Sequence, residues 1–205
     1  MQNLQGKFIV LDGPEGCGKS TQLRLLADHL QKAGMPLVTV RDPGTTRIGE
    51  QIRQILLNPE HVDMGMRCEM MLYMAARAQM MREVIRPALD AGTCVLCDRF
   101  VSSTLAYQLG GEGLSFDEIR RTADIAIGGR WPDLTIILDI APEKSFQRVQ
   151  REKDRIEQRP LAYHQQVHAN YLAQAKADGS GYRVVNADQS VECVQADILR
   201  VLTGL

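Results

Sequence analysis

The sequence FIVLDGPEGCGKST, residues 8–21, contains the pattern on which the rest of the chain depends. It begins with an apolar run at residues 8–11, which is long enough for a buried strand. Glycines and a proline at residues 13–18 interrupt the run, and apolar residues return at helical spacing after Lys19. Gly13, Gly18, Lys19 and Ser20 match G-x-x-x-x-G-K-[ST] between a strand and a helix, which indicates a phosphate-binding loop (P-loop).

The chemistry of this loop explains its spacing. Glycines let the backbone approach a polyphosphate, so that several N–H groups point inward, and the helix that follows adds its partial positive charge. Lys19 is expected to neutralise the β- and γ-phosphates, and Ser20 to offer its hydroxyl to Mg²⁺. The predicted triphosphate-binding residues are Gly13, Pro14, Glu15, Gly16, Cys17, Gly18, Lys19, Ser20 and Thr21.

Length and composition are typical of a single globular domain, residues 1–205. The formal net charge is −1, so no overall positive charge favours nucleic acid as a partner. No apolar run reaches membrane-spanning length and the first residues lack a signal-peptide core, so a cytoplasmic location without a membrane partner is expected. The five cysteines are scattered, as expected for reduced thiols.

Two pairs of residues that often bind metals are not expected to do so here. Cys94 and Cys97 lie in an apolar run, where positions three apart face opposite sides of a strand, so buried thiols are predicted. His164 and His168 are four residues apart but have no third ligand, so a surface position is predicted for them.

Segments that read as strands alternate with segments that read as helices along the whole chain. Strands are predicted at residues 8–11, 36–40, 93–97, 134–138 and 182–185. Helices are predicted at residues 19–33, 48–57, 66–89, 101–109, 116–127, 161–176 and 190–202, and a long one is predicted from residue 141 into the charged segment 148–159. This alternation predicts an α/β fold of three layers, with a five-stranded parallel sheet flanked by helices.

Charged residues follow three of the predicted strands. The P-loop follows the first strand, Arg41 and Asp42 follow the second, and Asp98 and Arg99 follow the third. Ligands of open parallel sheets bind at the carboxyl ends of the strands, so these groups are expected to meet beside the polyphosphate. Arginine binds phosphate oxygens in a bidentate fork, and an aspartate in this position can orient hydrated Mg²⁺.

The charged segment 148–159, RVQREKDRIEQR, has two interpretations. It is either a solvated helix with pairs of opposite charge four residues apart, or a lid that closes arginines over a transferring phosphoryl group. The P-loop favours the lid, because phosphoryl transfer depends on charge neutralisation and exclusion of water. If the acceptor of the phosphoryl group is a nucleoside monophosphate, its phosphate oxygen is already ionised and needs no deprotonation, so no general base is assigned.

The predicted helix at residues 66–89 is rich in methionine. Its methionines are expected either to pack adaptably in the core or to form a face against a second subunit, and both interpretations stay open.

Beyond the P-loop, several motifs occur in a fixed order from one end of the chain to the other. They are RDPGTT at 41–46, YMAAR at 73–77, DRF at 98–100 with STLAYQ at 103–108, RWPDL at 130–134 and DRIE at 154–157. The ordered set resembles that of bacterial thymidylate kinases. The resemblance implies a P-loop kinase fold, ATP-dependent phosphorylation of dTMP to dTDP with Mg²⁺, and a homodimer.

The resemblance also implies roles for individual residues. The thymine base would stack on Tyr73 and hydrogen-bond with Arg77, with Thr104 and Gln108 beside it, while Tyr107 would lie under the sugar. Arg41 and Arg99 would hold the acceptor phosphate, Glu15 would lie near the 3′-hydroxyl, Ser20 and Asp98 would hold Mg²⁺ partly through water, and Ala187 in the loop 186–188 would cover adenine.

Some members of this family carry an arginine inside the P-loop, where this chain has Gly16. In members of the present type the lid supplies the arginines, which points to Arg148, Arg151 and Arg155. The predicted catalytic residues are therefore Lys19, Arg99, Arg151, Arg155 and Glu15.

Three residues depart from the family pattern. Asp42 and Thr45 stand where R-E-P-G-G-T has glutamate and glycine, and Tyr73 stands where phenylalanine is usual. Because these departures concern the base site, a P-loop kinase that acts on another nucleotide or nucleoside stays an alternative. A nucleotide-binding switch without catalysis is the alternative from another class.

Overall fold

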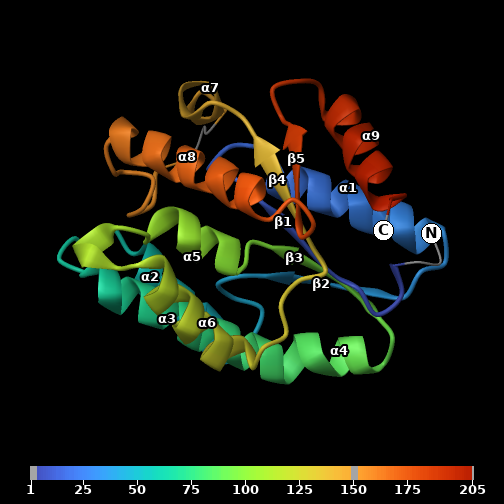
Figure 1. Cartoon of the computed structure of the whole chain (residues 1–205), viewed down its shortest axis with the longest axis horizontal. Coiled ribbons are helices and arrows are strands. Elements are labelled where there is room, and N and C mark those ends of the chain that lie inside the picture. Colours follow the sequence, from blue (N-terminus) through green and yellow to red (C-terminus); the bar gives the residue numbers. More distant parts are fainter. Residues whose placement is uncertain (1–3, 149–151, 205) are drawn as a thin grey trace.

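The computed structural model of the chain describes residues 4–148 and 152–204. Within them, one sheet is formed by β1 (Phe8–Asp12), β2 (Leu37–Arg41), β3 (Cys94–Asp98), β4 (Leu134–Asp139) and β5 (Tyr182–Asn186). The strand order is β2-β3-β1-β4-β5, and every neighbouring pair is parallel. The predicted parallel sheet is confirmed, and β1 lies at its centre (Figure 1).

Helices cover both faces of the sheet, which confirms the three layers (Figure 1). In chain order they are α1 (Lys19–Lys32), α2 (Arg47–Leu57), α3 (Met66–Met80), the π-helical turn η2 (Met81–Ile85), α4 (Arg86–Asp90), α5 (Val101–Tyr107), the 3-10 turn η3 (Gly111–Gly113), α6 (Phe116–Ile127), α7 (Pro142–Phe146), α8 (Leu161–Ala177) and α9 (Val191–Leu202).

The alternation of side chains along β1 separates two hydrophobic cores. Ile9 and Leu11 pack with residues of α1 and α9, whereas Phe8 and Val10 pack with residues of α3, η2, α5 and α6. All four side chains are fully buried. Successive residues of a strand point to opposite faces, so a continuous apolar strand requires helices on both sides.

The methionine-rich segment is helical throughout but is not one regular helix. A π turn at Met81–Ile85 separates α3 from α4, and Pro87 lies in the first turn of α4. Proline cannot donate an N–H to the preceding turn, so the hydrogen-bond ladder changes at this point. Met70, Met74, Met80 and Met81 are buried, which confirms the core interpretation for these residues.

The long helix predicted from residue 141 is wrong. α7 ends at Phe146, and residues 152–160 are not helical, with a turn at residues 155–158. The Asp154 side chain accepts the N–H groups of Ile156 and Glu157 at 2.9 and 3.0 Å, and the N–H of Arg155 binds a carbonyl at the end of α2 at 3.4 Å. Aspartate that bonds the backbone nearby in sequence competes with helix formation, which explains the difference.

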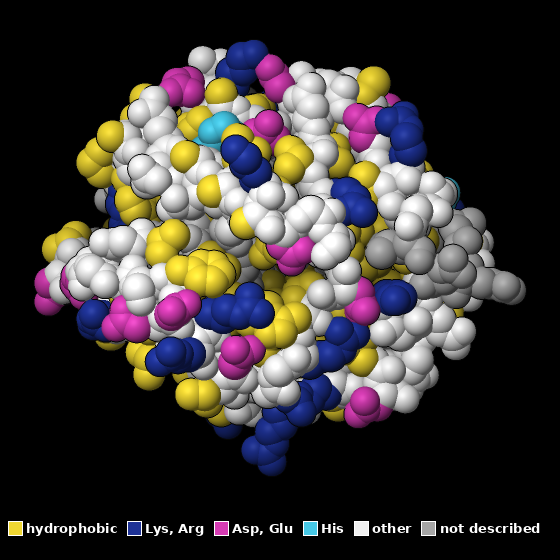
Figure 2. Space-filling view, viewed as in Figure 1, with side chains coloured by type: hydrophobic (Ala, Val, Ile, Leu, Met, Phe, Trp, Pro, Cys, Tyr) yellow, Lys and Arg dark blue, Asp and Glu magenta, His cyan; other side chains and the backbone are white. Residues whose placement is uncertain are grey.

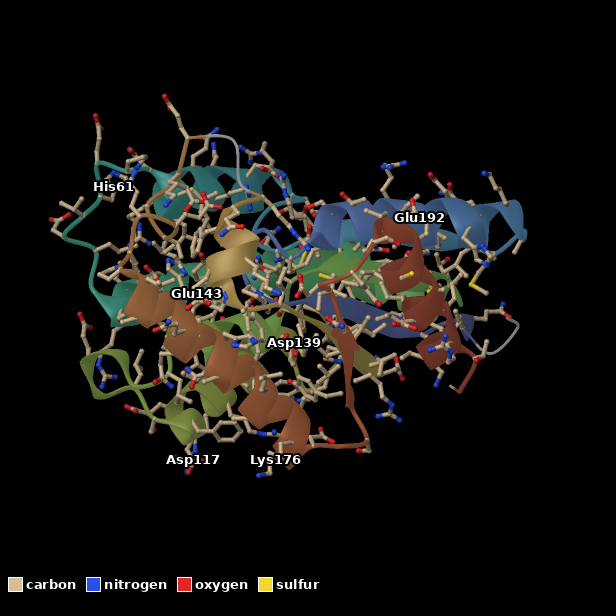
Figure 3. All side chains as sticks on the ribbon, turned by 90° about the horizontal axis from the view of Figure 1, so that it is seen from above. His61, Asp117, Asp139, Glu143, Lys176 and Glu192 are labelled. Carbon is tan, nitrogen blue, oxygen red and sulfur yellow. The ribbon has the colours of Figure 1, made fainter. Side chains whose placement is uncertain are left out.

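The predictions for cysteine and histidine are resolved by burial. Cys94 and Cys97 are fully buried free thiols, as predicted. The surface prediction is wrong for His164, which is 3% exposed and packs edge-on against Phe146. His168 Nε2 lies 2.6 Å from Asp139 Oδ1 and so ties α8 to the end of β4, where Figure 3 labels Asp139.

On the face shown in Figure 2, Lys and Arg side chains are interspersed with Asp and Glu, in keeping with the formal net charge of −1. Among the described residues, no helix is both long and apolar enough to cross a lipid bilayer.

Candidate active site

The P-loop connects β1 to α1 and forms the floor of the larger of two adjacent cavities. This larger cavity is about 660 Å³ and is lined by residues 15–22 together with charged residues from other elements. Gly13 has φ +140°, and a Cβ there would lie 2.6 Å from the carbonyl oxygen of Leu138. Only glycine fits this turn, because both the dihedral angle and the space exclude a side chain. The first turn of α1, residues 19–22, lines the cavity, and the first N–H groups of a helix are suited to binding an anion.

Lys19 begins α1 and lines the larger cavity. Its ammonium group donates to the carbonyl oxygens of Gly13 at 3.0 Å and Pro14 at 2.8 Å, so it is held over the loop. Cys17 lies behind it and is 2% exposed. Burial raises the pKa of the Cys17 thiol, against the opposing effect of the Lys19 and Arg99 charges.

Ser20 and Asp98, the two residues predicted for Mg²⁺, contact each other beside the P-loop. The Ser20 hydroxyl donates to Asp98 Oδ2 at 3.0 Å, and both residues line the larger cavity. A hydroxyl and a carboxylate are oxygen ligands of the kind that Mg²⁺ accepts together with phosphate oxygens and water. The pair therefore fits a magnesium ion bound chiefly through a nucleotide. No group of three or more His, Cys, Asp or Glu side chains suited to a metal occurs in the described ranges.

Arg99 lies at the junction of the two cavities and lines both. Its guanidinium pairs with Asp12 Oδ1 at 3.2 Å and Glu15 Oε1 at 2.5 Å, and it lies over the ring of Tyr107. Burial alone would lower the pKa of Arg99, but the nearby Glu15, Tyr107, Tyr171 and Asp12 raise it well above the ordinary value. The charge on Arg99 is thus maintained in a partly buried position.

Asp12 is a site residue that the sequence analysis missed. It is fully buried at the end of β1 and accepts hydrogen bonds from Gly13 N at 2.8 Å, Ser102 Oγ at 2.6 Å, Ser103 Oγ at 2.8 Å and Tyr171 OH at 2.7 Å, besides Arg99. Its signal was available, since an aspartate ends β1 just as Asp98 ends β3. In the sequence Asp12 directly follows the apolar run at residues 8–11, next to the glycine that opens the P-loop.

Arg41, which was predicted, and Arg53, which was not, add positive charge to the lining of the larger cavity. Arg41 ends β2 and pairs with Glu50 Oε1 at 3.0 Å. Arg53, on α2, lines both cavities and donates to the carbonyl of Pro43 at 3.2 Å. Burial lowers the pKa of Arg53, and the charge of Arg41 acts in the same direction. No sequence motif indicates Arg53, because this residue lies inside a regular amphipathic helix.

The smaller cavity, about 80 Å³, brings together the residues predicted for the nucleotide base. Tyr73, Arg77, Thr104, Tyr107 and Gln108 all line it. They come from α3 and α5 and the turn after α5, which are far apart in sequence from the P-loop. Burial raises the pKa of the Tyr73 hydroxyl, so it stays protonated and presents a donor.

Arg77 is fully buried and is held from several sides. Its Nε and a terminal nitrogen contact Asp42 Oδ2 at 2.7 and 2.5 Å, another contact goes to the carbonyl of Phe100 at 3.1 Å, and Thr104 Oγ1 lies 3.4 Å away. Asp42, which replaces the usual glutamate, is 2% exposed. Burial raises the pKa of Asp42, an effect that Arg77 opposes.

Thr45 shows how the loop after β2 tolerates the loss of a glycine. Its φ is +68°, a left-handed conformation that glycine adopts readily and threonine rarely. The Thr45 hydroxyl accepts the N–H of Arg41 at 2.8 Å and donates to the Arg41 carbonyl at 3.1 Å. Its N–H donates to Glu50 Oε1 at 2.8 Å. Hydrogen bonds therefore hold the backbone in the glycine-like conformation.

The three predicted lid arginines have different outcomes. Arg148 lines the larger cavity, donates to the carbonyl of Ala187 at 3.1 Å and pairs with Asp188 at 3.8 Å. Arg151 lies outside the described residues. Arg155 does not line either cavity: it is 7% exposed and its guanidinium contacts Leu56 O and Glu69.

The expectation that Arg155 reaches the phosphates is therefore not met in this structure, because Nε binds a carbonyl of α2 and one terminal nitrogen binds Glu69 of α3. The same segment still touches both cavities, since Ile156 lines the smaller one and Glu157 the larger one.

A glycine-rich loop at the end of the central strand of a parallel sheet, beside a second cavity that shares its arginines, defines a P-loop phosphotransferase. The family model for thymidylate kinase matches residues 11–198. A thymidylate kinase of Exiguobacterium sp. is 44% identical over 198 residues, which cover 96% of this chain and 93% of that protein. A thymidylate kinase of Pseudomonas putida is 42% identical over 205 residues, with 98% and 97% covered.

Structure gives the same result as sequence. The crystal structure of thymidylate kinase from Ehrlichia chaffeensis superposes with a TM-score of 0.76 at 27% identity, covering 97% of this chain and 99% of that chain. The chain belongs to the thymidylate kinase family.

Proposed function

We propose that this chain transfers the γ-phosphoryl group of ATP to dTMP and forms dTDP. One observation carries the proposal: the two cavities share Glu15, Asp42, Arg53 and Arg99 in their linings. A polyphosphate on the P-loop and a monophosphate whose base enters the smaller cavity would meet at these arginines. In-line transfer needs little more than that alignment and neutralised charge.

The donor nucleotide is assigned to the larger cavity. The P-loop N–H groups, Lys19 and the N-terminus of α1 provide positive potential for the β- and γ-phosphates. Ala187 and Arg148 line the same cavity and are joined by a hydrogen bond, which supports the loop after β5 as the adenine side.

The acceptor nucleotide is assigned to the smaller cavity. Tyr73 offers a ring for stacking, and Arg77 and Thr104 offer polar groups to the edge of the base. Tyr107, whose hydroxyl lies 3.3 Å from Glu15 Oε1, would lie under the sugar with Glu15 near the 3′-hydroxyl. Arg99 and Arg53, with Arg41 beside them in the larger cavity, would hold the acceptor phosphate.

Magnesium would be held by Ser20 and Asp98 through the nucleotide and water. When bound, Mg²⁺ supplies charge neutralisation on the β- and γ-phosphate oxygens. The residues of the chain perform the other tasks: Lys19 and Arg99 orient the two phosphates, and Arg151 is proposed as the lid arginine at the transferring group. With no general base assigned, the reaction rests on positioning and electrostatic stabilisation.

The test is a coupled ADP-release assay with ATP and Mg²⁺ and separate dTMP, dUMP, dCMP, dGMP and UMP. Strong preference for dTMP is the expected result, and Lys19→Ala should reduce turnover by at least about 100-fold while the far-UV circular dichroism stays unchanged. A preference for another monophosphate would transfer the assignment to the alternative kinase. Tight ATP binding with no turnover of any acceptor would support a nucleotide-binding switch without catalysis. Membership of an enzyme family disfavours that alternative.

We also propose that two copies pair through α3 and α6. The two helices pack together and carry exposed apolar side chains: Met71 is 56% exposed, Phe116 45% and Ile125 85%. Sedimentation velocity should show a dimer that Ile125→Asp shifts to monomer, and a monomeric wild type would contradict the proposal. A cytoplasmic location stays a prediction, supported by five free thiols.

A further inference from the structure

Glu69 is a buried carboxylate that the functions assigned above do not use. It lies on α3, two turns from Arg77, and is fully buried. Buried carboxylates are costly unless each oxygen is paired, so its partners are informative. Those partners come from the turn after α5 and from the segment 154–159 that borders both cavities.

The two oxygens of Glu69 have different partners. Oε2 accepts from Arg155 at 2.5 Å and from Arg159 at 2.7 Å. Oε1 accepts from Gln108 Nε2 at 2.7 Å. The arginines occupy one oxygen and the glutamine amide the other, so the contacts of the carboxylate are divided without overlap.

This division fixes which way the Gln108 amide points. A carboxylate flanked by two guanidinium groups only accepts hydrogen bonds, so the amide must present its NH₂ group to Glu69. The carbonyl Oε1 of Gln108 is then left buried and without a partner among the described residues, in a side chain that is 1% exposed and lines the smaller cavity. A buried unpaired acceptor at a cavity wall indicates a ligand that donates an N–H.

We propose that Glu69 is a positioning residue for base recognition: it locks the Gln108 amide so that an acceptor faces the smaller cavity and selects a base with a ring N–H. This inference rests on the proposed function. Thymine and uracil carry a hydrogen on N3, whereas N3 of cytosine is an acceptor and would face Gln108 Oε1 with no hydrogen between them. A site built around a buried hydrogen-bonding group discriminates strongly against a ligand that leaves the group unpaired.

The same carboxylate also positions the lid segment. Arg155 and Arg159 hold residues 154–159 against α3, and Ile156 from this segment forms part of the wall of the smaller cavity. Arg159 is held further by Tyr163, whose hydroxyl donates to the carbonyl of Tyr107 at 2.8 Å. Glu69 thus orients the Gln108 amide and also holds in place the segment that forms part of the cavity wall. Arg155 acts here as a positioning residue.

The decisive variant is Glu69→Gln. The two arginines require an oxygen, so the introduced amide must keep its carbonyl toward them and turn its NH₂ group toward Gln108. The Gln108 amide then reverses and presents a donor to the cavity, which suits N3 of cytosine. The ratio of kcat/KM for dTMP over dCMP is expected to fall by about 10- to 100-fold. The ratio for dTMP over dUMP should not change, because both bases carry the N3 hydrogen.

Two further variants separate orientation from general damage. The double variant Glu69→Gln with Gln108→Glu restores an acceptor facing the cavity, so the preference for dTMP over dCMP should return. Arg159→Met leaves the contact between Glu69 and Gln108 in place, so it should lower kcat/KM for dTMP, dUMP and dCMP by the same factor. If Glu69→Gln does not fold, Glu69→Asp keeps the charge but shortens the side chain by one methylene, and the same fall in ratio is expected.

A uniform loss for all three nucleotides in Glu69→Gln or Glu69→Asp would overturn the inference and leave Glu69 a purely structural residue. Binding of dTMP and dCMP without ATP, measured by calorimetry on the same variants, provides the second readout. It tests base selection even where turnover is absent. Failure of the wild type to phosphorylate dTMP would instead contradict the proposed function, so the two failures are distinguishable.

Discussion

Replacement of Asp12 by asparagine removes one negative charge from the most highly connected carboxylate of the site. Asp12 is fully buried, and its partners include Gly13, Tyr171 and Arg99. In Asp12→Asn the amide oxygen is expected to face the two groups that can only donate hydrogen bonds, the N–H of Gly13 and the guanidinium of Arg99. The amide NH₂ group then faces the hydroxyl of Ser102, which can rotate and accept.

The main loss is therefore the charge pair with Arg99, whose nearest contact is 3.2 Å. Two unit charges about 4 Å apart attract by about 4 kcal/mol at an effective dielectric constant of about 20. Asparagine also avoids the desolvation penalty of the carboxylate, and Arg99 retains Glu15 at 2.5 Å, so about half of this attraction is expected as net loss. The free energy of unfolding should fall by about 2 kcal/mol in Asp12→Asn.

Urea unfolding followed by circular dichroism measures this change, and steady-state kinetics measures its effect on the acceptor. Without the Asp12 charge, the guanidinium of Arg99 should shift toward Glu15 and hold the acceptor phosphate less well, so the KM for dTMP should rise by about tenfold. Asp28→Asn is the matched control, since Asp28 pairs with Arg24 on the exposed side of α1 at 3.5 Å and should change stability by less than about 0.5 kcal/mol. Equal stability of the two variants would refute the reasoning.

Three further predictions concern single residues. Burial lowers the pKa of His164, so as the pH falls below the ordinary value of 6.5 the unfolded chain binds a proton at this residue before the folded chain does. The wild type should therefore lose more resistance to urea between about pH 7.5 and about pH 5.5 than His164→Phe does. Identical losses in the two proteins would contradict this prediction. A thiol reagent should label the exposed Cys68 and Cys193 of the native enzyme rapidly and Cys17 only after unfolding, and rapid labelling of Cys17 would show that its burial is not maintained. Thr45→Val keeps the shape but loses both hydrogen bonds of the hydroxyl, so the unfolding free energy should fall by about 1–2 kcal/mol, and no change would mean that these bonds do not hold the loop.

Local patterns in the sequence were sufficient for most of the fold. The capping box that starts α6 was readable from Ser115 and Glu118, because its contacts lie within three residues. The strands were readable because a parallel sheet buried on both faces demands continuous apolar runs. The strand order β2-β3-β1-β4-β5 was not predicted, because the alternation of helices and strands does not determine which strands are neighbours.

The failures share a physical cause. Most of residues 152–159 carry side chains that are common in helices, yet the segment is not helical because Asp154 binds the N–H groups of its own neighbours and Arg155 binds α2. His164 looked like a surface histidine because its burial is set by Phe146 from α7. In each case the deciding contact comes from another element, and no local window contains it.

The site divides in the same way. The P-loop could be predicted because phosphate binding there depends on consecutive residues whose backbone does the work. Arg53 and Glu69 could not be predicted, because each acquires its role from partners in other elements. Glu69 and Gln108, for example, are 39 residues apart and are joined by one hydrogen bond.

The arginines show most clearly what the fold adds to the sequence. In the charged segment Arg148 and Arg155 are equivalent by composition, and the lid motif alone assigned both to phosphate. The fold separates them by the acceptors within reach: Arg155 is bound to the buried carboxylate of Glu69, whereas Arg148 lines the larger cavity and contacts Asp188 and the carbonyl of Ala187 there. A buried carboxylate binds the nearest guanidinium whatever motif that guanidinium belongs to, because leaving either charge unpaired costs several kcal/mol, on the order of 3–5. Which arginines remain available to a nucleotide is therefore decided by where the chain buries its acidic residues.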